Sequence, residues 1–354
     1  MEEKIKRISK WIKGKNFPFT IELNLTNLCN LKCKMCWLRS NTPNLNELED
    51  EVWLRVVEEA VELGIKEFRI PGSGEPLMRK SLVFKLMKKI KEGGGNGLLI
   101  SNGTLFNEND VRKMVEMEWD VLTLSLDGPN PKINDFIRGK NAFKRVTRTL
   151  EWLKKWKKKL KTQIPWLRMN VVLTNKNYDK LDKMVKLAKK YEFKEVLLQP
   201  MTIFSKEGEK LSLKNLNIDK FLLKGIEMAK ELKIKTNFKL FLRNKIVKMT
   251  NEMERLIENE IKKFKGFLAI PCYEPFYNLI ISPSGNIKVC AVANESNLNV
   301  KNKSLKQIWF SKYLMQARKN LKKHKLFSFC SHCCVPIFLE NKRIRTQLVR
   351  LNAI

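Results

Sequence analysis

The chain has 354 residues with 70 Lys or Arg against 37 Asp or Glu, which gives a formal net charge of +33. This length is enough for one large domain, or for a large and a small one, with a substantial hydrophobic core. No apolar run is long enough to span a membrane, and the charged residues 1–13 lack the apolar region of a secretory signal. We therefore expect a cytoplasmic protein whose eight cysteines are free thiols or metal ligands rather than disulfides.

The excess positive charge is mostly lysine, and it is spread over almost every predicted helix. Scattered lysine is weaker evidence for a polyanion site than a focused patch. A compositional bias of the proteome is the simpler interpretation. Binding of nucleic acid or an anionic lipid is the alternative.

Residues 1–13 predict a basic amphipathic helix with Ile5, Ile8, Trp11 and Ile12 on one face and lysines around it. Such a helix can lie on a membrane surface. Packing on its own domain is the default interpretation.

The predicted strand 19–25 leads into three closely spaced cysteines, Cys29, Cys33 and Cys36. Iron–sulfur clusters of the 4Fe–4S type are normally held by four thiolates. Three thiolates this close together can surround one face of a cluster and leave one iron open for another ligand. Zinc fits less well, because it prefers four nitrogen or sulfur ligands and the chain has only two histidines.

Strands and helices then alternate, which predicts an α/β fold with a parallel sheet and right-handed crossovers. Polar or glycine-rich loops follow the predicted strands, and in barrels of this type the site forms at the carboxyl ends of the strands. The predicted strands are 67–70, 98–100, 121–124, 168–173 and 196–200, and the predicted helices include 51–63, 143–161 and 179–191.

The cysteine triad near the N-terminus and the Gly74-Glu75-Pro76 turn after the second strand resemble the radical S-adenosylmethionine (radical SAM) superfamily. The resemblance implies a partial (β/α)6 TIM-like barrel and a SAM-binding 4Fe–4S cluster held by the triad. It also implies that Gly74 and Glu75 hold the amino group of SAM. Ser73 stands where the family has the first of two glycines, and its role is left open.

Further polar residues of the strand-following loops are candidates for SAM contacts by the same resemblance. A hydroxyl and a guanidinium suit an anionic group, so Ser125 and Arg138 are assigned to the SAM carboxylate. Asn102 is either a SAM contact or a turn residue.

A second cysteine group begins at Cys272, continues through a predicted hairpin (277–281 and 287–290, turned by 282–286) and ends after a predicted helix, 305–321. It resembles the twitch or SPASM extension of radical SAM enzymes. The implied ligands of one auxiliary 4Fe–4S cluster are Cys272, Cys290, Cys330 and Cys333.

A full pair of auxiliary clusters would need more cysteines than remain, and Cys334 is interpreted as a surplus buried thiol. A structural zinc site is the alternative, because two distant cysteines with a C-x2-C pair also fit zinc. The predicted parts are an N-terminal helix in 1–18, the barrel in 19–235, a helical linker in 236–270 and a small hairpin-and-helix iron–sulfur extension in 271–354.

The resemblance implies an oxidoreductase that cleaves SAM reductively to a 5′-deoxyadenosyl radical, which then abstracts hydrogen from a substrate. Such an enzyme needs an electron donor such as ferredoxin or flavodoxin. The leading hypothesis is oxidation or cross-linking of a peptide or small-molecule precursor. Radical modification of RNA or an anionic lipid and a non-catalytic iron–sulfur electron-transfer or binding scaffold are the alternatives.

One departure from the family limits what is carried over. Sulfatase-maturating relatives have an aspartate after the cysteine that corresponds to Cys290, and this chain has Ala291 there. We therefore do not expect the reaction of that subgroup.

Overall fold

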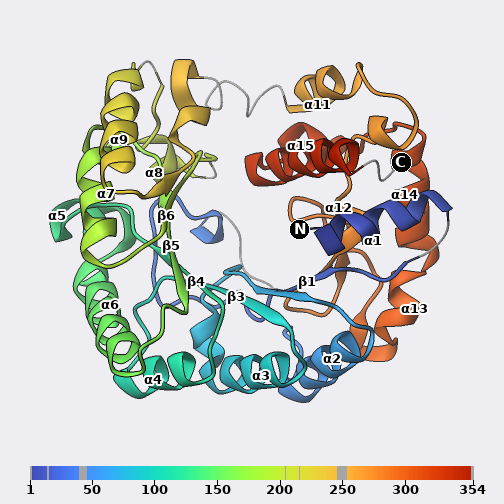
Figure 1. The fold of residues 1–354 in the computed structure, drawn as a ribbon, viewed down its shortest axis with the longest axis horizontal. Helices are drawn as coiled ribbons and strands as arrows, with labels where there is room; N and C mark the ends of the chain where they lie inside the picture. The colour runs from blue at the N-terminus through green and yellow to red at the C-terminus, as the bar shows by residue number, and fades with distance from the viewer. Residues whose placement is uncertain are drawn as a thin grey trace.

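The computed structural model of the chain describes residues 2–13, 16–39, 46–203, 205–214, 216–244 and 253–351. Within them, one sheet runs in the order β7-β6-β5-β4-β3-β2-β1-β8-β9, and helices cover its outer side (Figure 1). The strands are β1 Thr20–Leu23, β2 Glu67–Ile70, β3 Asn96–Ser101, β4 Val121–Ser125, β5 Trp166–Val172, β6 Glu195–Gln199, β7 Lys235–Thr236, β8 Asn278–Ile281 and β9 Ile287–Lys288.

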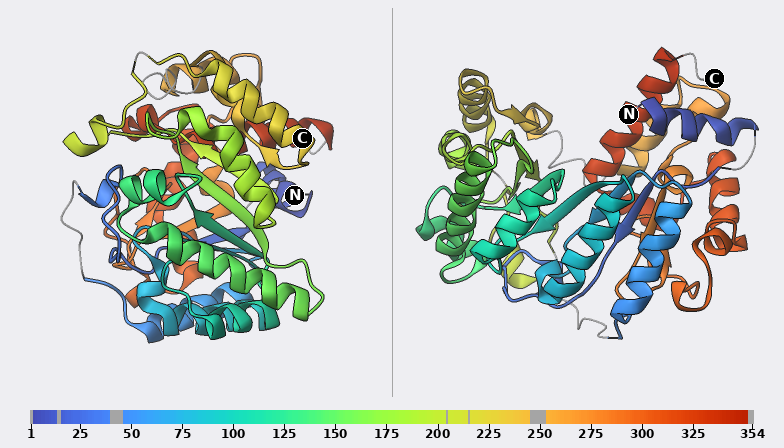
Figure 2. Two further views of the ribbon diagram at one scale, coloured as in Figure 1. Left: turned by 90° about the vertical axis from the view of Figure 1, so that its left-hand side faces the viewer. Right: turned by 60° about the horizontal axis from the view of Figure 1, so that its bottom comes forward.

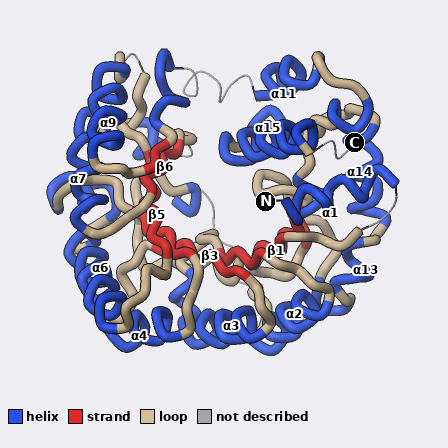
Figure 3. Tube along the Cα trace, viewed as in Figure 1, coloured by secondary structure: helices blue, strands red, loops and turns tan. Residues whose placement is uncertain are grey.

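The strands from β1 to β7 are all parallel, and the sheet curves into an open arc with the helices outside it (Figure 3). The prediction of an α/β partial barrel is confirmed. The helices and 3-10 turns of the barrel part are α2 Asp50–Glu62, η2 Pro76–Arg79, α3 Lys80–Glu92, α4 Glu108–Glu116, α5 Pro131–Arg138, α6 Ala142–Lys159, η3 Tyr178–Lys180, α7 Leu181–Lys190, α8 Lys206–Glu209 and α9 Asp219–Glu231.

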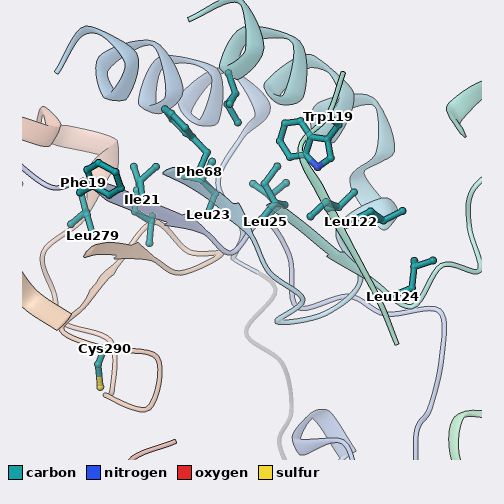
Figure 4. Close-up of a cluster of buried hydrophobic side chains, with 14 of the residues drawn as sticks. Phe19, Ile21, Leu23, Leu25, Phe68, Trp119, Leu122, Leu124, Leu279 and Cys290 are labelled. Carbon is teal, nitrogen blue, oxygen red and sulfur yellow. The ribbon is translucent and has the colours of Figure 1, made fainter. Parts of the chain in front are cut away.

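The main core lies between the sheet and the outer helices. Alternate residues of a strand point to opposite faces, and in β1 and β2 the fully buried residues Ile21, Leu23, Phe68 and Ile70 form one such face. Figure 4 shows Phe68 and Trp119 between the sheet and these helices. The other face of the strands is therefore left to line the inside of the arc.

The C-terminal hairpin joins the barrel sheet rather than forming a sheet of its own. Strand β8 pairs in parallel with β1, with Leu23 opposite Ile281, and β9 pairs antiparallel with β8. Gly285 turns the hairpin with a φ of +85°, a conformation that glycine adopts without strain. The auxiliary cysteines are thereby fixed to the same sheet that carries the N-terminal cysteine loop.

The region after the barrel differs from the sequence prediction in two places. The predicted helix 305–321 is broken into α13 (Leu305–Trp309) and α14 (Lys312–Lys322), because the Ser311 side chain accepts a hydrogen bond from Leu314 N and starts a new helix. The final helix α15 (Val335–Arg350) was not predicted. The remaining elements are η1 Trp37–Arg39, η4 Phe238–Asn244, α11 Met253–Ile261, η5 Gly266–Ala269, α12 Glu274–Tyr277, η6 Val300–Asn302 and η7 Ser328–His332.

The N-terminal helix α1 (Glu2–Lys13) packs on the C-terminal part of the chain, beside α12 and α15 (Figure 2). Ile5, Ile8 and Trp11 are buried there, whereas Ile12 is exposed. Lys4, which the amphipathic pattern places among the solvent-facing lysines, is buried instead. Its Nζ lies 2.7 Å from Glu340 Oε1 and over the ring of Tyr277, so a half-buried carboxylate compensates its charge. Across the described part of the chain, no helix combines the length and apolar character that crossing a membrane requires.

Candidate functional site

The three N-terminal cysteines lie on a loop that begins just after β1 and rests against the end of α5. Lys34 N donates to Ile137 O over 2.9 Å, and Cys33 Sγ lies 3.7 Å from Arg138 O. The pKa of Cys33 is raised to about 11, chiefly by burial; Arg138 opposes this shift, and Asp127, Cys36 and Cys29 contribute to it. The three thiols are therefore close enough to act on one another's charge, as ligands of one cluster must.

The glycine turn after β2 is hydrogen-bonded to the start of this loop. Gly74 N donates to Thr26 O and Glu75 N donates to Leu28 O, each over 2.8 Å. A Cβ on Gly74 would lie 2.1 Å from Leu28 O, so only glycine allows this approach. Ser73, whose role the sequence left open, donates its hydroxyl to Asn24 Oδ1 over 2.7 Å and has a structural contact.

Glu75 is almost fully buried and its carboxylate already has three donors. Ser101 Oγ and Leu77 N donate to Oε1, and Asn102 N donates to Oε2. Burial raises the pKa of Glu75, and these three hydrogen bonds and the more distant Arg138 oppose that shift. A carboxylate has about four acceptor positions, so Glu75 retains one for a ligand such as an ammonium group.

Asn102 lies between Glu75 and the cysteine loop. Its Nδ2 donates to Asn30 Oδ1 over 2.9 Å and lies 4.0 Å from Cys29 Sγ, and its Oδ1 accepts from Thr104 Oγ1. Asn102 therefore forms a local turn through Thr104 and also lies near Cys29. Its contact with SAM stays a prediction. Asn30 and Thr104, which the sequence did not single out, complete this network.

Arg138 is buried, and its partner is an aspartate that sequence reasoning did not select. Arg138 Nε lies 2.7 Å from Asp127 Oδ2, and Asp127 is fully buried. Asp127 Oδ1 also accepts from Val172 N at the end of β5. Arg138 is therefore held in place next to Cys33. The sequence feature that could have pointed to Asp127 is the Asp-Gly-Pro turn that follows β4.

Ser125 ends β4 opposite Asn170 of β5 and is half-buried. Its position at the carboxyl end of a strand is the one predicted. Its assignment to the SAM carboxylate stays a prediction.

The four predicted auxiliary ligands line one apolar cavity. Cys272, Cys290, Cys330 and Cys333 border it together with aromatic and aliphatic side chains of the C-terminal part. Figure 4 shows Cys290 on a loop on the side of the sheet away from the outer helices. Burial raises the pKa of Cys290 to about 11, so the thiols are neutral until a metal displaces their protons.

Two further observations concern this cavity. Asn341 of the unpredicted helix α15 donates its Nδ2 to Cys272 Sγ over 3.5 Å, a contact that suits a ligating thiolate. Cys334 does not line the cavity, and burial raises its pKa to about 12. By solvent exposure Cys334 is half-buried, and its place outside the ligand set stays a prediction.

The spacing of these thiols bears on zinc. Among the described residues, no three His, Cys, Asp or Glu side chains are close enough together to hold a single metal ion. Four thiolates around one Zn²⁺ lie about 3.8 Å apart, since each Zn–S bond is about 2.3 Å. Thiolates on a 4Fe–4S cluster bind four different irons and lie farther apart.

The inner face of the sheet carries charged side chains. Glu22 and Arg69 are opposite each other on β1 and β2, and Arg168 of β5 pairs with Glu195 of β6 over 2.7 Å. Burial raises the pKa of Glu22, which Arg69 opposes and Glu274 reinforces. These residues are partly exposed, so the inside of the arc is open to a polar ligand.

Comparisons with known proteins agree with this geometry. Residues 23–188 match the Radical SAM superfamily, and residues 272–334 match the SPASM family, described as an iron–sulfur cluster-binding domain. The chain belongs to the radical SAM superfamily. Its cofactors are accordingly SAM and a 4Fe–4S cluster, with auxiliary iron–sulfur binding in the C-terminal part.

Individual relatives match over about half of the chain. Mycofactocin maturase MftC of Mycolicibacterium smegmatis is 26% identical over 184 residues, which are 52% of this chain and 45% of that protein. The AdoMet-dependent heme synthase of Methanosarcina barkeri is 30% identical over 176 residues, 49% of this chain and 48% of that protein. The chain thus spans about half the length of the curated relatives it matches.

Solved structures match over more of the chain. Streptococcus suis SuiB bound to precursor peptide SuiA has a TM-score of 0.62 at 18% identity, covering 89% of this chain and 70% of that one. The structure of anSMEcpe with bound AdoMet has a TM-score of 0.61 at 17% identity, covering 94% and 97%. These likenesses establish the shared fold of a radical SAM barrel with its C-terminal extension.

Proposed function

We propose that this radical SAM protein is an enzyme that oxidises or cross-links a peptide or small-molecule precursor. The observation that carries the proposal is the position of two different cysteine sites on one sheet. An open triad lies at the carboxyl ends of the barrel strands, and a four-cysteine cavity is attached through β8 and β9. The inner face of that sheet carries charged, partly exposed side chains.

In this proposal Cys29, Cys33 and Cys36 hold the SAM-binding cluster. When bound and reduced, that cluster supplies the electron that splits SAM into methionine and a 5′-deoxyadenosyl radical. Glu75 orients the amino group of SAM through its remaining acceptor position, supported by the hydroxyl of Ser101. Asn102 links the loop of Cys29 to that carboxylate, because its side chain donates to Asn30 and its backbone N–H donates to Glu75.

Arg138 and Ser125 face the carboxylate of SAM. The buried Asp127 fixes the orientation of Arg138, so that a guanidinium edge is presented without a large entropic cost on binding. Burial of this ion pair also keeps water away from Cys33.

Cys272, Cys290, Cys330 and Cys333 hold the auxiliary cluster, in surroundings that are mainly apolar. A substrate on the inner face would lie inside the arc of the sheet. There it would be oxidised by passing one electron to the auxiliary cluster. An external reductant of the ferredoxin or flavodoxin class completes the scheme. The proposed parts of the chain remain the N-terminal helix, the barrel of 19–235, the linker of 236–270 and the extension of 271–354.

Support for a peptide comes from the relatives. PqqA peptide cyclase of Rhizobium meliloti is 30% identical over 176 residues, and SuiB has been solved with a precursor peptide. The heme synthase and a GTP 3′,8-cyclase also match, so a small-molecule precursor is part of the same proposal.

The test is anaerobic reconstitution with iron and sulfide, followed by reduction in the presence of SAM. We expect 5′-deoxyadenosine by mass spectrometry, and we expect it to fall to background in Cys33→Ala. Cys334→Ala is the matched control, because that thiol lies outside both proposed ligand sets. SAM that binds but is never cleaved, with or without candidate peptides, would identify a scaffold instead of an enzyme.

A further inference from the structure

A basic groove lies on the outside of the C-terminal part, between α1 and α14. It has a volume of about 710 Å³ and is lined by Trp11, Lys312, Met315, Gln316, Arg318, Lys319, Lys322 and Lys323. Five of these eight residues are cations and none is acidic. The basic groove is therefore a focused patch, unlike the lysines scattered over the rest of the surface.

Arg318 is the buried member of this set. Its guanidinium lies over Trp309, 3.9 Å from the ring centroid, and over Trp11 at 4.6 Å. Nε donates to Pro275 O and Nη1 donates to Trp309 O, each over 2.7 Å. These contacts fix the plane of the guanidinium at the side of the basic groove.

No carboxylate compensates this charge. Within the described ranges, Arg318 has no ion pair with an acidic side chain within 4.0 Å, although only 2% of the residue is exposed. Burial alone lowers its pKa to about 9. Burying a cation without a counter-charge is costly. The nearby ammonium group of Lys322 repels the guanidinium of Arg318 and adds to this cost.

Two donors at the same place lack acceptors. In the part of the chain that is described, neither Arg318 Nη2 nor Trp11 Nε1 has a hydrogen-bond partner. Buried polar groups are nearly always paired, so the positive charge of Arg318 at the wall of the groove is compensated neither by a carboxylate nor by a full set of hydrogen bonds.

We propose that the basic groove binds a multiply charged oxyanion of the phosphate class. Its oxygens accept from the exposed ammonium groups of Lys312, Lys319 and Lys323, and the uncompensated charge of the buried Arg318 adds to the attraction. Five cations without a carboxylate match a phosphate or diphosphate better than a single carboxylate. The site is separate from the residues assigned to SAM and to the clusters, so it does not depend on the proposed reaction.

The test measures pyrophosphate binding to the reconstituted full chain by titration calorimetry at low salt. We expect binding to weaken by about fivefold for Lys319→Gln and by about fivefold again when Lys323→Gln is added. Lys306→Gln removes an exposed lysine of α13 that does not line the groove, and it should bind as the original chain does.

A second arm uses vesicles that contain phosphatidic acid, to decide whether the phosphate is free or part of a lipid headgroup. Vesicle binding that Lys319→Gln/Lys323→Gln loses, without pyrophosphate binding, would support the site and assign it to a headgroup. Equal binding by the double variant and Lys306→Gln in both arms would overturn the proposal. So would a chain that binds neither probe.

Discussion

The two cysteine sites of this chain are built in opposite ways. The N-terminal triad comes from eight consecutive residues on one loop, held at its ends by backbone hydrogen bonds to α5 and to the glycine turn. The auxiliary set comes from residues that are 61 positions apart in sequence, and it closes an apolar cavity. A short loop can leave one iron open, whereas a set of four distant thiols encloses its metal.

The surroundings of the two cysteine sites differ in the same way. The triad has the polar groups Glu75 and Arg138, which we predict to bind SAM, near its thiols. The auxiliary site has apolar neighbours and the amide of Asn341. We therefore expect changes at the triad to affect chemistry first, and changes at the auxiliary site to affect metal content and the fate of the substrate.

The largest contrast should come from removing one thiol at each site. Cys330→Ala should lose about half of the iron, since each site is assigned one four-iron cluster, and it can still cleave SAM without product formation. Cys33→Ala should also lose about half but cleave no SAM. Iron and sulfide analysis with 5′-deoxyadenosine detection separates the two. Unchanged iron in Cys330→Ala would refute the auxiliary assignment.

The next effect concerns the ion pair beside the triad. Asp127→Asn should reduce the free energy of unfolding by about 3–5 kcal/mol, because it leaves Arg138 buried without a counter-charge. The control is Lys155→Met, which breaks an exposed pair with Glu108 and should cost less than about 1 kcal/mol. Urea unfolding of the metal-free chain measures both. Equal costs would show that Arg138 is solvated in solution.

A smaller effect is expected from pH in the metal-free chain. Burial raises the pKa of Cys290 from 9.0 to about 11, so the folded state holds its proton more tightly than the unfolded state. That contribution to stability is complete below pH 9 and is lost as the pH rises toward 11. Between pH 8 and pH 10 we expect a loss of about 1 kcal/mol from this thiol.

The check is urea unfolding under anaerobic conditions at several pH values, compared with Cys290→Ala. The variant should lack this part of the pH dependence. A metal-free chain that becomes more stable across the same range would contradict the burial of this thiol.

The smallest effect should come from Cys334. Because it lies outside the cavity, Cys334→Ala should leave the iron content and the optical spectrum of the reconstituted chain unchanged. A loss of iron similar to that of Cys333→Ala would make Cys334 the fourth ligand, and would remove the distinction between a closed set of four and a surplus thiol.

The RNA or lipid alternative stays a prediction, since none of the relatives named above bears on it. A steep salt dependence of tRNA binding would support it. The basic groove is the candidate site for such binding, so Lys319→Gln and Lys323→Gln should reduce it.

Much of the barrel was predictable from local pattern. Strand β2 was found at its predicted bounds. The predicted helix at 143–161 corresponds to α6, displaced by one or two residues. Apolar alternation and helical periodicity carry this information because each element buries one face against the same core. The cysteine spacing and the polar turns after the strands likewise indicated where the site would form.

The break between α13 and α14 was not predicted, because apolar periodicity continues through it and only the cap of Ser311 interrupts the backbone. Helix α15 was missed although its residue Asn341 contacts Cys272. Lys4 looked like one more surface lysine, and only the position of Glu340 shows why it is buried.

The sequence by itself determined the family, the strand order along the barrel and the identity of the thiols, since spacing and periodicity are local properties of the chain. Only the tertiary structure decided the pairing of β8 with β1, the partner of Arg138 and the position of Arg318 without a counter-charge. The physical reason is that burial and ion pairing depend on which distant segments meet, and no local pattern records that.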